Sequence, residues 1–150
     1  VGSALAGSRA FIERARRFRK MFGGGMRQAG IIAAGALFAL RHQRARLTDD
    51  HANAKALAAE LTSIRGLEVA VAEVETNMVR FRVLNMPAPE LVQRLQKRGV
   101  LVLAVGRDTL RAVTSLMVSA EDIRVAIARA GEALARDAAV SPRVEFDSQA

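Results

Sequence analysis

The stretch 29–40, written AGIIAAGALFAL, constrains the fold more than any other part of the chain, because it carries no charge on any side. Its 12 residues fall well short of the roughly 20 that a membrane-spanning helix needs, so we expect no membrane partner. A helix that is apolar all round is buried by other protein. We therefore predict a helix over about 26–47 whose first half is covered on every side and whose second half, RHQRAR, reaches water.

The segment before this run predicts a short buried strand at 1–6 and then a basic helix. Ser8 suits the N-cap position, since its hydroxyl can accept a hydrogen bond from an amide of the first turn. Apolar residues recur at helical spacing between basic ones, at Phe11, Ile12, Ala15, Phe18 and Phe22. Glycines 23–25 end the helix. A chain that opens on VGSALAG, without methionine, leads us to expect a preceding part.

All the excess positive charge lies in the first third. Residues 1–47 hold ten basic side chains against Glu13 alone, whereas 48–150 hold 13 basic and 14 acidic ones. The basic helix is most often a solvated face, but it could also line a subunit interface or meet an anion. A nucleic-acid-binding module is one function with this footprint. We expect no nucleic acid, because 4% aromatic residues, with no Trp or Tyr, provide few stacking platforms.

The remainder predicts a small α+β domain, within an overall α/β fold class, in which helices cover an antiparallel sheet. Thr48 is expected to cap a third helix, with Asp49 and Asp50 favourable at its N-terminus. Ser119 is expected to cap the last helix. The other predicted elements are strands at 67–71, 77–84, 100–105 (buried) and 109–114, and a short helix from Pro87 to Gly99.

The predicted domain organisation follows from these elements. Residues 1–25 end one domain, 26–47 form a bridging helix, 48–137 form the small domain, and 138–150 form a flexible tail. The chain has no cysteine, which excludes thiol chemistry and favours a cytoplasmic location. Its two histidines, His42 and His51, are too far apart for one helical ligand face, so we expect no metal.

Several segments resemble the low-specificity threonine aldolases, pyridoxal-phosphate enzymes of the aminotransferase type I fold. They are VGSALAGSRAFIERARRFRKMFGGGMRQAG at 1–30, DDHANAKALA at 49–58, VETNMV at 74–79, LRAVT at 110–114 and VSAEDI at 118–123. The resemblance implies cleavage of threonine or allo-threonine to glycine and acetaldehyde by a homo-oligomer, a dimer or tetramer. Another β-eliminating lyase and a non-catalytic interaction module are the alternatives.

The family pattern places the cofactor lysine just before the point where this chain begins. The chain's own lysines are Lys20, in a run of arginines, and Lys55 and Lys97, on amphipathic surface helices. None has a suitable setting, because a Schiff-base lysine needs a desolvated or cation-flanked pocket. We therefore expect no catalytic residue in this chain and no activity from it alone. It would be the C-terminal portion of such an enzyme, binding pyridoxal 5'-phosphate only together with the missing part.

Two arginines are the candidate binding residues. Arg27 is expected at a helix start, where free amides and nearby glycines favour an anion, and the resemblance implies that it reaches the cofactor phosphate across a subunit interface. The alternative is an arginine paired with a carboxylate or facing solvent. Arg111 is expected on the strand face opposite Leu110 and Ala112. The resemblance implies that it binds the substrate α-carboxylate; the alternative is an edge-strand arginine in water.

Other matches to the family are weaker. His51 and Asn77 occupy family positions, but a surface histidine and an asparagine that bonds backbone are the stronger interpretations. After Thr114 the family has a histidine and, two residues on, an aspartate, where this chain has Ser115 and Met117. This departure puts the hydrogen bonding around the Arg111 strand in doubt.

Overall fold

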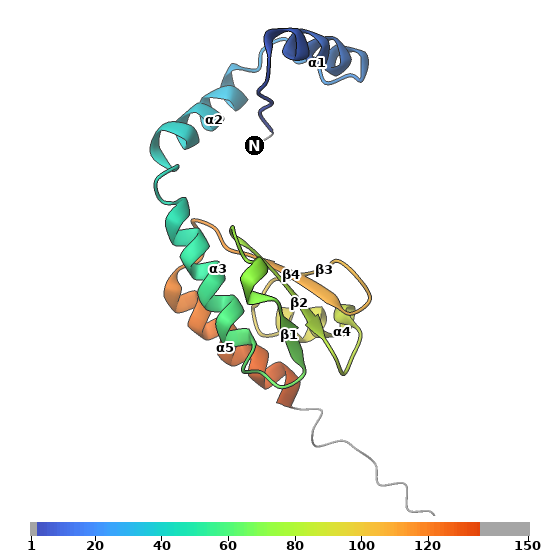
Figure 1. Ribbon diagram of the computed structural model, residues 1–150, viewed down its shortest axis with the longest axis vertical. Coiled ribbons are helices and arrows are strands. Elements are labelled where there is room, and N and C mark those ends of the chain that lie inside the picture. The colour runs from blue at the N-terminus through green and yellow to red at the C-terminus, as the bar shows by residue number, and fades with distance from the viewer. Residues whose placement is uncertain (1–2, 136–150) are drawn as a thin grey trace, which may run out of the picture. The chain divides into compact units, whose positions relative to one another are not determined.

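The structure is a computed structural model that describes residues 3–135 of the 150-residue chain (Figure 1). It divides into two compact units, Val1–Ala45 and Arg46–Ala150. Within the described residues the first unit is helical, and the second combines helices with a four-stranded antiparallel sheet, in agreement with the predicted mixed α/β class.

Helix α1 (Arg9–Met21) forms as predicted, with Ser8 as its N-cap. The Ser8 hydroxyl accepts a hydrogen bond from the Phe11 amide at 3.4 Å. Gly23, whose φ of 80° only glycine adopts readily, ends the helix, and the Gly24 amide donates to the Arg19 carbonyl at 2.8 Å. A Cβ on Gly24 would lie 3.2 Å from that carbonyl oxygen. The glycines therefore have a structural role at the end of α1.

The strand predicted at 1–6 was wrong for the residues that the structure describes. Residues 3–6 are irregular, because a strand needs a neighbouring ladder and no strand of the described chain pairs with them. Residues 1 and 2 lie outside the described part.

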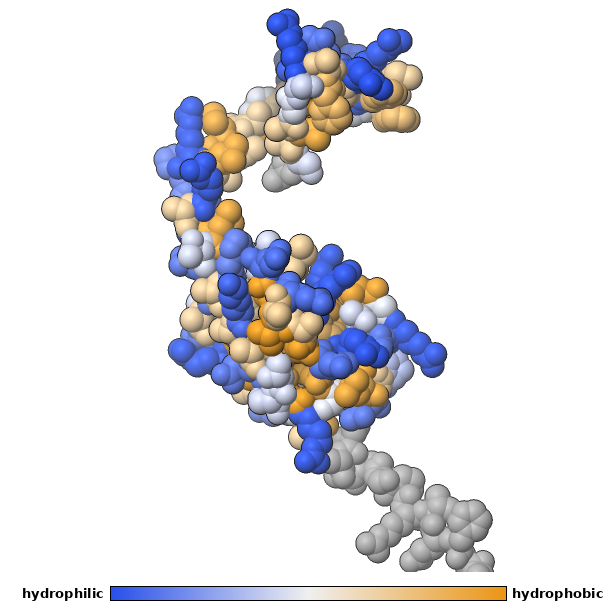
Figure 2. Space-filling view, in the orientation of Figure 1, coloured by the Kyte–Doolittle hydropathy of each residue, from blue (hydrophilic) through white to orange (hydrophobic). Residues whose placement is uncertain are grey.

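Helix α2 (Gly30–His42) is shorter than the predicted helix over 26–47. It begins at Gly30, after Ala29 as N-cap, and ends before Gln43. The expected burial is also wrong for this chain: none of its residues is buried, and Ile31 is 91% exposed. The reason is that no described element packs on it. Figure 2 shows hydrophobic surface on this first unit. No described helix is long and apolar enough to cross a membrane.

The sheet of the second unit has the order β1-β2-β4-β3, with every neighbouring pair antiparallel. Its strands are β1 (Leu67–Val69), β2 (Met78–Val83), β3 (Leu103–Ala104) and β4 (Thr109–Val113). Burial alternates along β2 and β4, so one face is packed and the opposite face is open. The packed face carries Val79, Phe81, Val83, Leu110 and Ala112.

Helices cover the packed face, as the sequence predicts. Helices α3 (Leu47–Leu61) and α5 (Ala120–Ala135) contact each other, and α3 also contacts β1 and β2 (Figure 1). Helix α4 (Ala88–Gln96) contacts α5 and the three strands β2, β3 and β4. A 3-10 turn, η1 (Val71–Glu73), lies between β1 and β2. The core of this unit is built by α3, α4, α5 and the packed sheet face.

The buried strand predicted at 100–105 was wrong in length and in burial. Only Leu103–Ala104 pairs with β4, and both residues are exposed. Leu101 is 78% exposed, whereas Val100 and Val102 pack against the core. An apolar run indicates burial only where another element covers both sides, and the described chain covers only one side of this segment.

Thr48 is not the N-cap of α3, because the helix already begins at Leu47 after Arg46. Asp49 and Asp50 do lie in its first turn, as predicted. Asp50 is buried, and the Arg46 guanidinium binds its carboxylate with nitrogen–oxygen distances of 2.5 and 3.2 Å. The ion pair between Arg46 and Asp50 thus fixes the start of the helix.

Thr114 ties α3 to the sheet. It is 1% exposed, and its hydroxyl donates to the Asp50 carbonyl at 2.7 Å. We expect Thr114→Val to lower the free energy of unfolding by about 1–2 kcal/mol, since this buried carbonyl loses its donor. Urea denaturation measures the loss. Thr76→Val, at an exposed threonine, is the control and should change stability by less than about 0.5 kcal/mol.

Ser119 caps α5 as predicted. The Asp122 amide donates to the Ser119 hydroxyl at 3.2 Å, and the Asp122 carboxylate accepts from the Ser119 hydroxyl at 2.6 Å and the Ser119 amide at 2.8 Å. These bonds form a reciprocal capping box. The hydrogen bonds from Ser119 lower the pKa of Asp122 below its usual value of 3.8.

This capping box predicts a dependence of stability on pH. The Asp122 pKa is lower in the folded chain, so the contribution is fully present above the unfolded pKa and is lost as pH falls through the folded value. We expect thermal stability to fall as pH drops below about 4. In Asp122→Asn this part of the loss should disappear, whereas Asp49→Asn should retain it. Melting temperatures measured from pH 6 to pH 2 test the difference, and identical curves for both variants would contradict it.

Candidate functional site

The sequence predicted Arg27 at the start of a helix. In the structure Arg27 lies in the segment between α1 and α2. Its side chain is exposed, and it forms no hydrogen bond or ion pair with any residue of the described chain. Within residues 3–135, Arg27 is therefore not paired with a local carboxylate, which was one of the two alternatives. Solvent exposure, the other alternative, describes Arg27 in this chain. Its guanidinium is available to an external anion.

The start of α2 also suits an anion. Its N-cap residue is Ala29, whose side chain cannot accept a hydrogen bond, so no side chain caps the amides of the first turn. Such amides, together with the helix dipole, bind phosphate and carboxylate groups. A Cβ on Gly30 would meet nothing within 4 Å, which leaves this end of the helix sterically open. The exposed Arg27 guanidinium and these uncapped amides are therefore candidate contacts for a phosphate.

Arg111 occupies the middle of β4, on the open face of the sheet. Its neighbours Leu110 and Ala112 are buried on the packed face, so the predicted alternation is confirmed. The Nε atom of Arg111 is buried and has no hydrogen-bond partner within the described residues. A buried donor without a partner is costly, which makes this atom a candidate contact for an external acceptor.

A hollow of about 390 Å³ lies beside Arg111. Its lining comes from η1, the segment after it, β2 and β4, and consists of Ala70, Glu73, Val74, Glu75, Thr76, Met78, Arg80 and Arg111. Neither Arg80 nor Arg111 forms an ion pair with a residue of the described chain, although two glutamates share the lining. The hollow therefore offers unpaired guanidinium groups to a carboxylate.

Arg80 is a site residue that sequence reasoning missed. In the register of β2 and β4, Arg80 lies directly opposite Arg111. Like charges in opposite positions destabilise a sheet, and an anion bound between them would relieve the repulsion. The alternation in VRFRV already places Arg80 on one strand face. The sequence could not indicate its partner, because the register between β2 and β4 is set by the folded sheet.

Arg82, two residues along the same face, differs from both candidates. Its guanidinium binds Asp108 at 2.8 Å and Glu68 at 2.9 Å, and these contacts raise its pKa while that of Asp108 is lowered. Arg82 is thus already matched by carboxylates of the chain. Arg80 and Arg111 are the arginines on this face that have no carboxylate partner among the described residues. Arg82 therefore provides a control position for experiments.

The structural interpretation of Asn77 is supported. Its side-chain amide donates to the Thr114 carbonyl at 2.8 Å, and its own carbonyl accepts from the Thr114 amide at 2.9 Å. Asn77 thus extends the pairing of β2 with β4 by one position. His51 lies half-buried on α3 and makes no hydrogen bond within the described residues, so nothing here assigns it a role.

Ser115 and Met117 follow β4 at the positions where the resemblance implies a histidine and an aspartate. The Ser115 hydroxyl accepts from the Met117 amide at 3.4 Å, while Met117 is 85% exposed. Neither residue contacts Arg111 through a hydrogen bond. The hydrogen bonds that support the end of β4 come instead from Asn77 to Thr114 and from Thr114 to Asp50.

A mixed α/β chain with an arginine-lined hollow on its sheet and a free arginine before a helix start is consistent with an enzyme domain that binds small anions. The beta-eliminating lyase family model matches residues 1–83, and the chain belongs to this family.

Among individual relatives, the low-specificity threonine aldolases are prominent. The chain is 38% identical over 126 residues to low-specificity L-threonine aldolase 1 of Arabidopsis thaliana, covering 82% of this chain and 35% of that protein. It is 44% identical over 123 residues to the low specificity L-threonine aldolase of Escherichia coli strain K12, with the same two coverages. The predicted resemblance is confirmed. The chain spans about a third of the length of these relatives.

Solved structures show the same fold. A protein of Exiguobacterium sp. 255-15, provisionally described as an aromatic amino acid beta-eliminating lyase/threonine aldolase, matches 85% of this chain and 39% of its own length, at 19% identity and a TM-score of 0.56. Oryza sativa TDC, solved with PLP and tryptamine, matches 61% of this chain and 23% of its own, at 24% identity and a TM-score of 0.51. At these identities the likeness establishes the fold alone.

All three lysines of the chain lie on exposed surface. Lys20 is exposed in the last turn of α1, Lys55 is exposed on α3, and Lys97 is exposed just after α4. None lines the hollow beside Arg111. None of the three therefore has the desolvated pocket that activates a Schiff-base lysine.

Proposed function

We propose that this chain is the C-terminal portion of a pyridoxal 5'-phosphate-dependent threonine aldolase with the aminotransferase type I fold, cleaving threonine or allo-threonine to glycine and acetaldehyde. The observation that carries the proposal is Arg111, with its buried unpaired Nε at a hollow, in a chain about 40% identical to threonine aldolases. The remaining two thirds of such an enzyme would supply the cofactor lysine.

Arg111 anchors the substrate in this proposal. Its planar guanidinium binds the α-carboxylate through two parallel N–H donors, one of them the buried Nε. This contact fixes the substrate's orientation and hence which bond at Cα faces the reacting group. Arg80, across the strand pair, adds positive charge at the same hollow. Neither arginine exchanges a proton in the reaction.

Arg27 and the start of α2 hold the cofactor phosphate in this proposal. The guanidinium would bind the phosphate, and the uncapped amides of the first turn would donate to it. The cofactor, when bound, supplies the electron-withdrawing ring that stabilises the charge left on Cα when the Cα–Cβ bond breaks. The proton of the β-hydroxyl leaves in that step and Cα takes up a proton, which yields glycine and acetaldehyde.

A homo-oligomer is part of the proposal. The first unit exposes apolar side chains on both helices and at the C-cap of α1: Phe11, Phe18, Phe22, Ile31, Phe38 and Leu40 are between 47% and 91% exposed. Apolar surface of this kind marks protein–protein contact. In this proposal the rest of the subunit and a second subunit cover the apolar surface. This arrangement agrees with a phosphate site to which Arg27 contributes across a subunit interface.

A chimeric enzyme tests the proposed function. The segment of the Escherichia coli enzyme that aligns with this chain is replaced by this chain, and acetaldehyde release from threonine is measured with added cofactor. We expect release by the chimera and none by this chain alone. Failure of a folded, cofactor-loaded chimera to cleave threonine would contradict the proposal.

The same chimera distinguishes a β-eliminating lyase, the second candidate, which the family match favours. Such an activity would release pyruvate and ammonia from serine, because the bond that breaks is then between Cβ and its leaving group. Pyruvate release exceeding acetaldehyde release would assign the chain to that reaction.

A further inference from the structure

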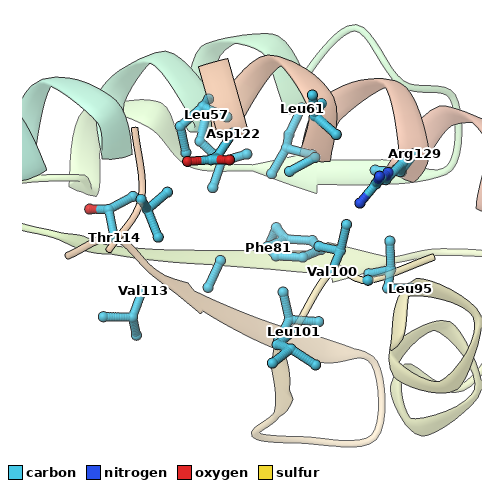
Figure 3. Close-up of a pocket in the computed structure, with 18 of the residues that line it drawn as sticks. Leu57, Leu61, Phe81, Leu95, Val100, Leu101, Val113, Thr114, Asp122 and Arg129 are labelled. Carbon is cyan, nitrogen blue, oxygen red and sulfur yellow. The ribbon is translucent and has the colours of Figure 1, made fainter. Parts of the chain in front are cut away.

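The second unit contains another hollow, of about 380 Å³, between α5 and the sheet (Figure 3). Its walls include Leu61 from α3, Phe81 from β2, Leu95 from α4 and the segment 99–102. It opens beside the segment where a buried strand was expected, at the exposed Leu101. Protein interiors are close-packed, so a hollow of this size between core elements is large enough to receive a ligand.

The lining is apolar apart from three side chains: Thr114, Asp122 and Arg129. The hydroxyl of Thr114 is already bonded to the Asp50 carbonyl, and the carboxylate of Asp122 is already bonded to Ser119 in the cap of α5. Arg129 has no hydrogen bond or ion pair within the described residues. The one unmatched charge that the described lining presents is therefore positive.

Arg129 projects from α5 toward the space between Val100 and Leu95 (Figure 3). Gly99, with a φ of 74°, lets the chain turn there, and a Cβ on it would lie 3.2 Å from the Arg129 Nη1 atom. Glycine at this position thus leaves room for the guanidinium at the rim. Apolar walls with a single cation at the rim complement a molecule with an apolar body and one carboxylate.

We propose that this hollow is a binding site for an apolar monocarboxylate, whose acidic head binds Arg129 and whose hydrocarbon body lies against Phe81, Leu61 and Leu95. No residue lines both this hollow and the hollow beside Arg111. The proposal does not depend on the proposed aldolase function.

The probes are octanoate, octanol and octylammonium, which share one hydrocarbon body and differ in the head group. Each is titrated into the full chain, and binding is followed by backbone amide NMR. We expect octanoate to bind about tenfold or more tightly than octanol, octylammonium to bind most weakly, and shifts at residues 99–102 and 125–130.

Variants assign the head-group contact. Arg129→Met should remove the preference for octanoate over octanol while leaving octanol binding unchanged. The control, Arg124→Met, alters an arginine of the same helix that pairs with Glu121 outside this lining, and it should keep the preference. Ala126→Phe, which fills the hollow, should weaken octanoate and octanol alike without lowering the melting temperature.

Three results would overturn the proposal. They are equal affinities for octanoate and octanol in the unmodified chain, an undiminished preference in Arg129→Met, and shifts confined to α1 and α2. The last result would mean that the probes bind the exposed apolar helices of the first unit instead.

Discussion

Replacing Arg111 by methionine in the chimeric enzyme is expected to lower kcat/KM for threonine about 100-fold or more. Methionine keeps the length and apolar character of the side chain, so the strand should retain its packing while the substrate carboxylate loses its two donors. The unpaired Nε shows that residues 3–135 do not satisfy this donor of the guanidinium. Initial rates of acetaldehyde release over a range of threonine concentrations measure the effect.

Arg82→Met is the matched control for this prediction. It removes an arginine from the same sheet face, but one already bound by Glu68 and Asp108. We expect kcat/KM to remain within about threefold of the unmodified chimera, since exposed ion pairs contribute little. Equal losses in Arg111→Met and Arg82→Met would show that the charge of the sheet face matters and that Arg111 has no specific contact.

Replacing Arg27 by methionine is expected to raise the dissociation constant of pyridoxal phosphate in the chimera about 10- to 100-fold. The variant loses a charge-assisted contact to the phosphate, while the amides at the start of α2 remain. Equilibrium dialysis of the cofactor at constant ionic strength measures the change. With saturating cofactor, kcat should recover most of its original value, because Arg27 binds a group remote from the reacting atoms.

Arg41→Met provides the control for Arg27. Arg41 lies exposed in the last turn of α2, so its loss removes the same net charge from the same unit at the other end of the helix. The dissociation constant of the cofactor in Arg41→Met should stay within about twofold of the value for the unmodified chimera. A loss as large as that of Arg27→Met would reduce the proposed phosphate contact to a general effect of charge.

The sequence predicted local features well where the determinants lie a few residues apart. Ser8 and Ser119 cap α1 and α5, and the alternation of Arg80 and Arg82 with buried residues marks one face of β2. The prediction at Thr48 failed because the Arg46–Asp50 ion pair allows α3 to begin earlier. The four-residue spacing of Arg46 and Asp50 in the sequence allows this ion pair. Its burial depends on tertiary packing, which the sequence does not show.

Burial was the property that sequence reasoning predicted least well. The apolar run of α2 and the apolar segment 100–105 were both expected to be covered, yet Ile31 and Leu101 are largely exposed. An apolar residue favours removal from water, but its apolarity does not indicate which surface covers it. The roles of Arg27 and Arg111 stay predictions, although the surroundings of both fit an anion.

By itself the sequence determined the caps of α1 and α5, the strand alternation and the family, because each depends on residue types at short, fixed spacings. Only the tertiary structure decided that Arg80 faces Arg111, that the Arg111 Nε lacks a partner among the described residues, and that a hollow opens beside Arg129. These features depend on strand register and on packing between distant segments.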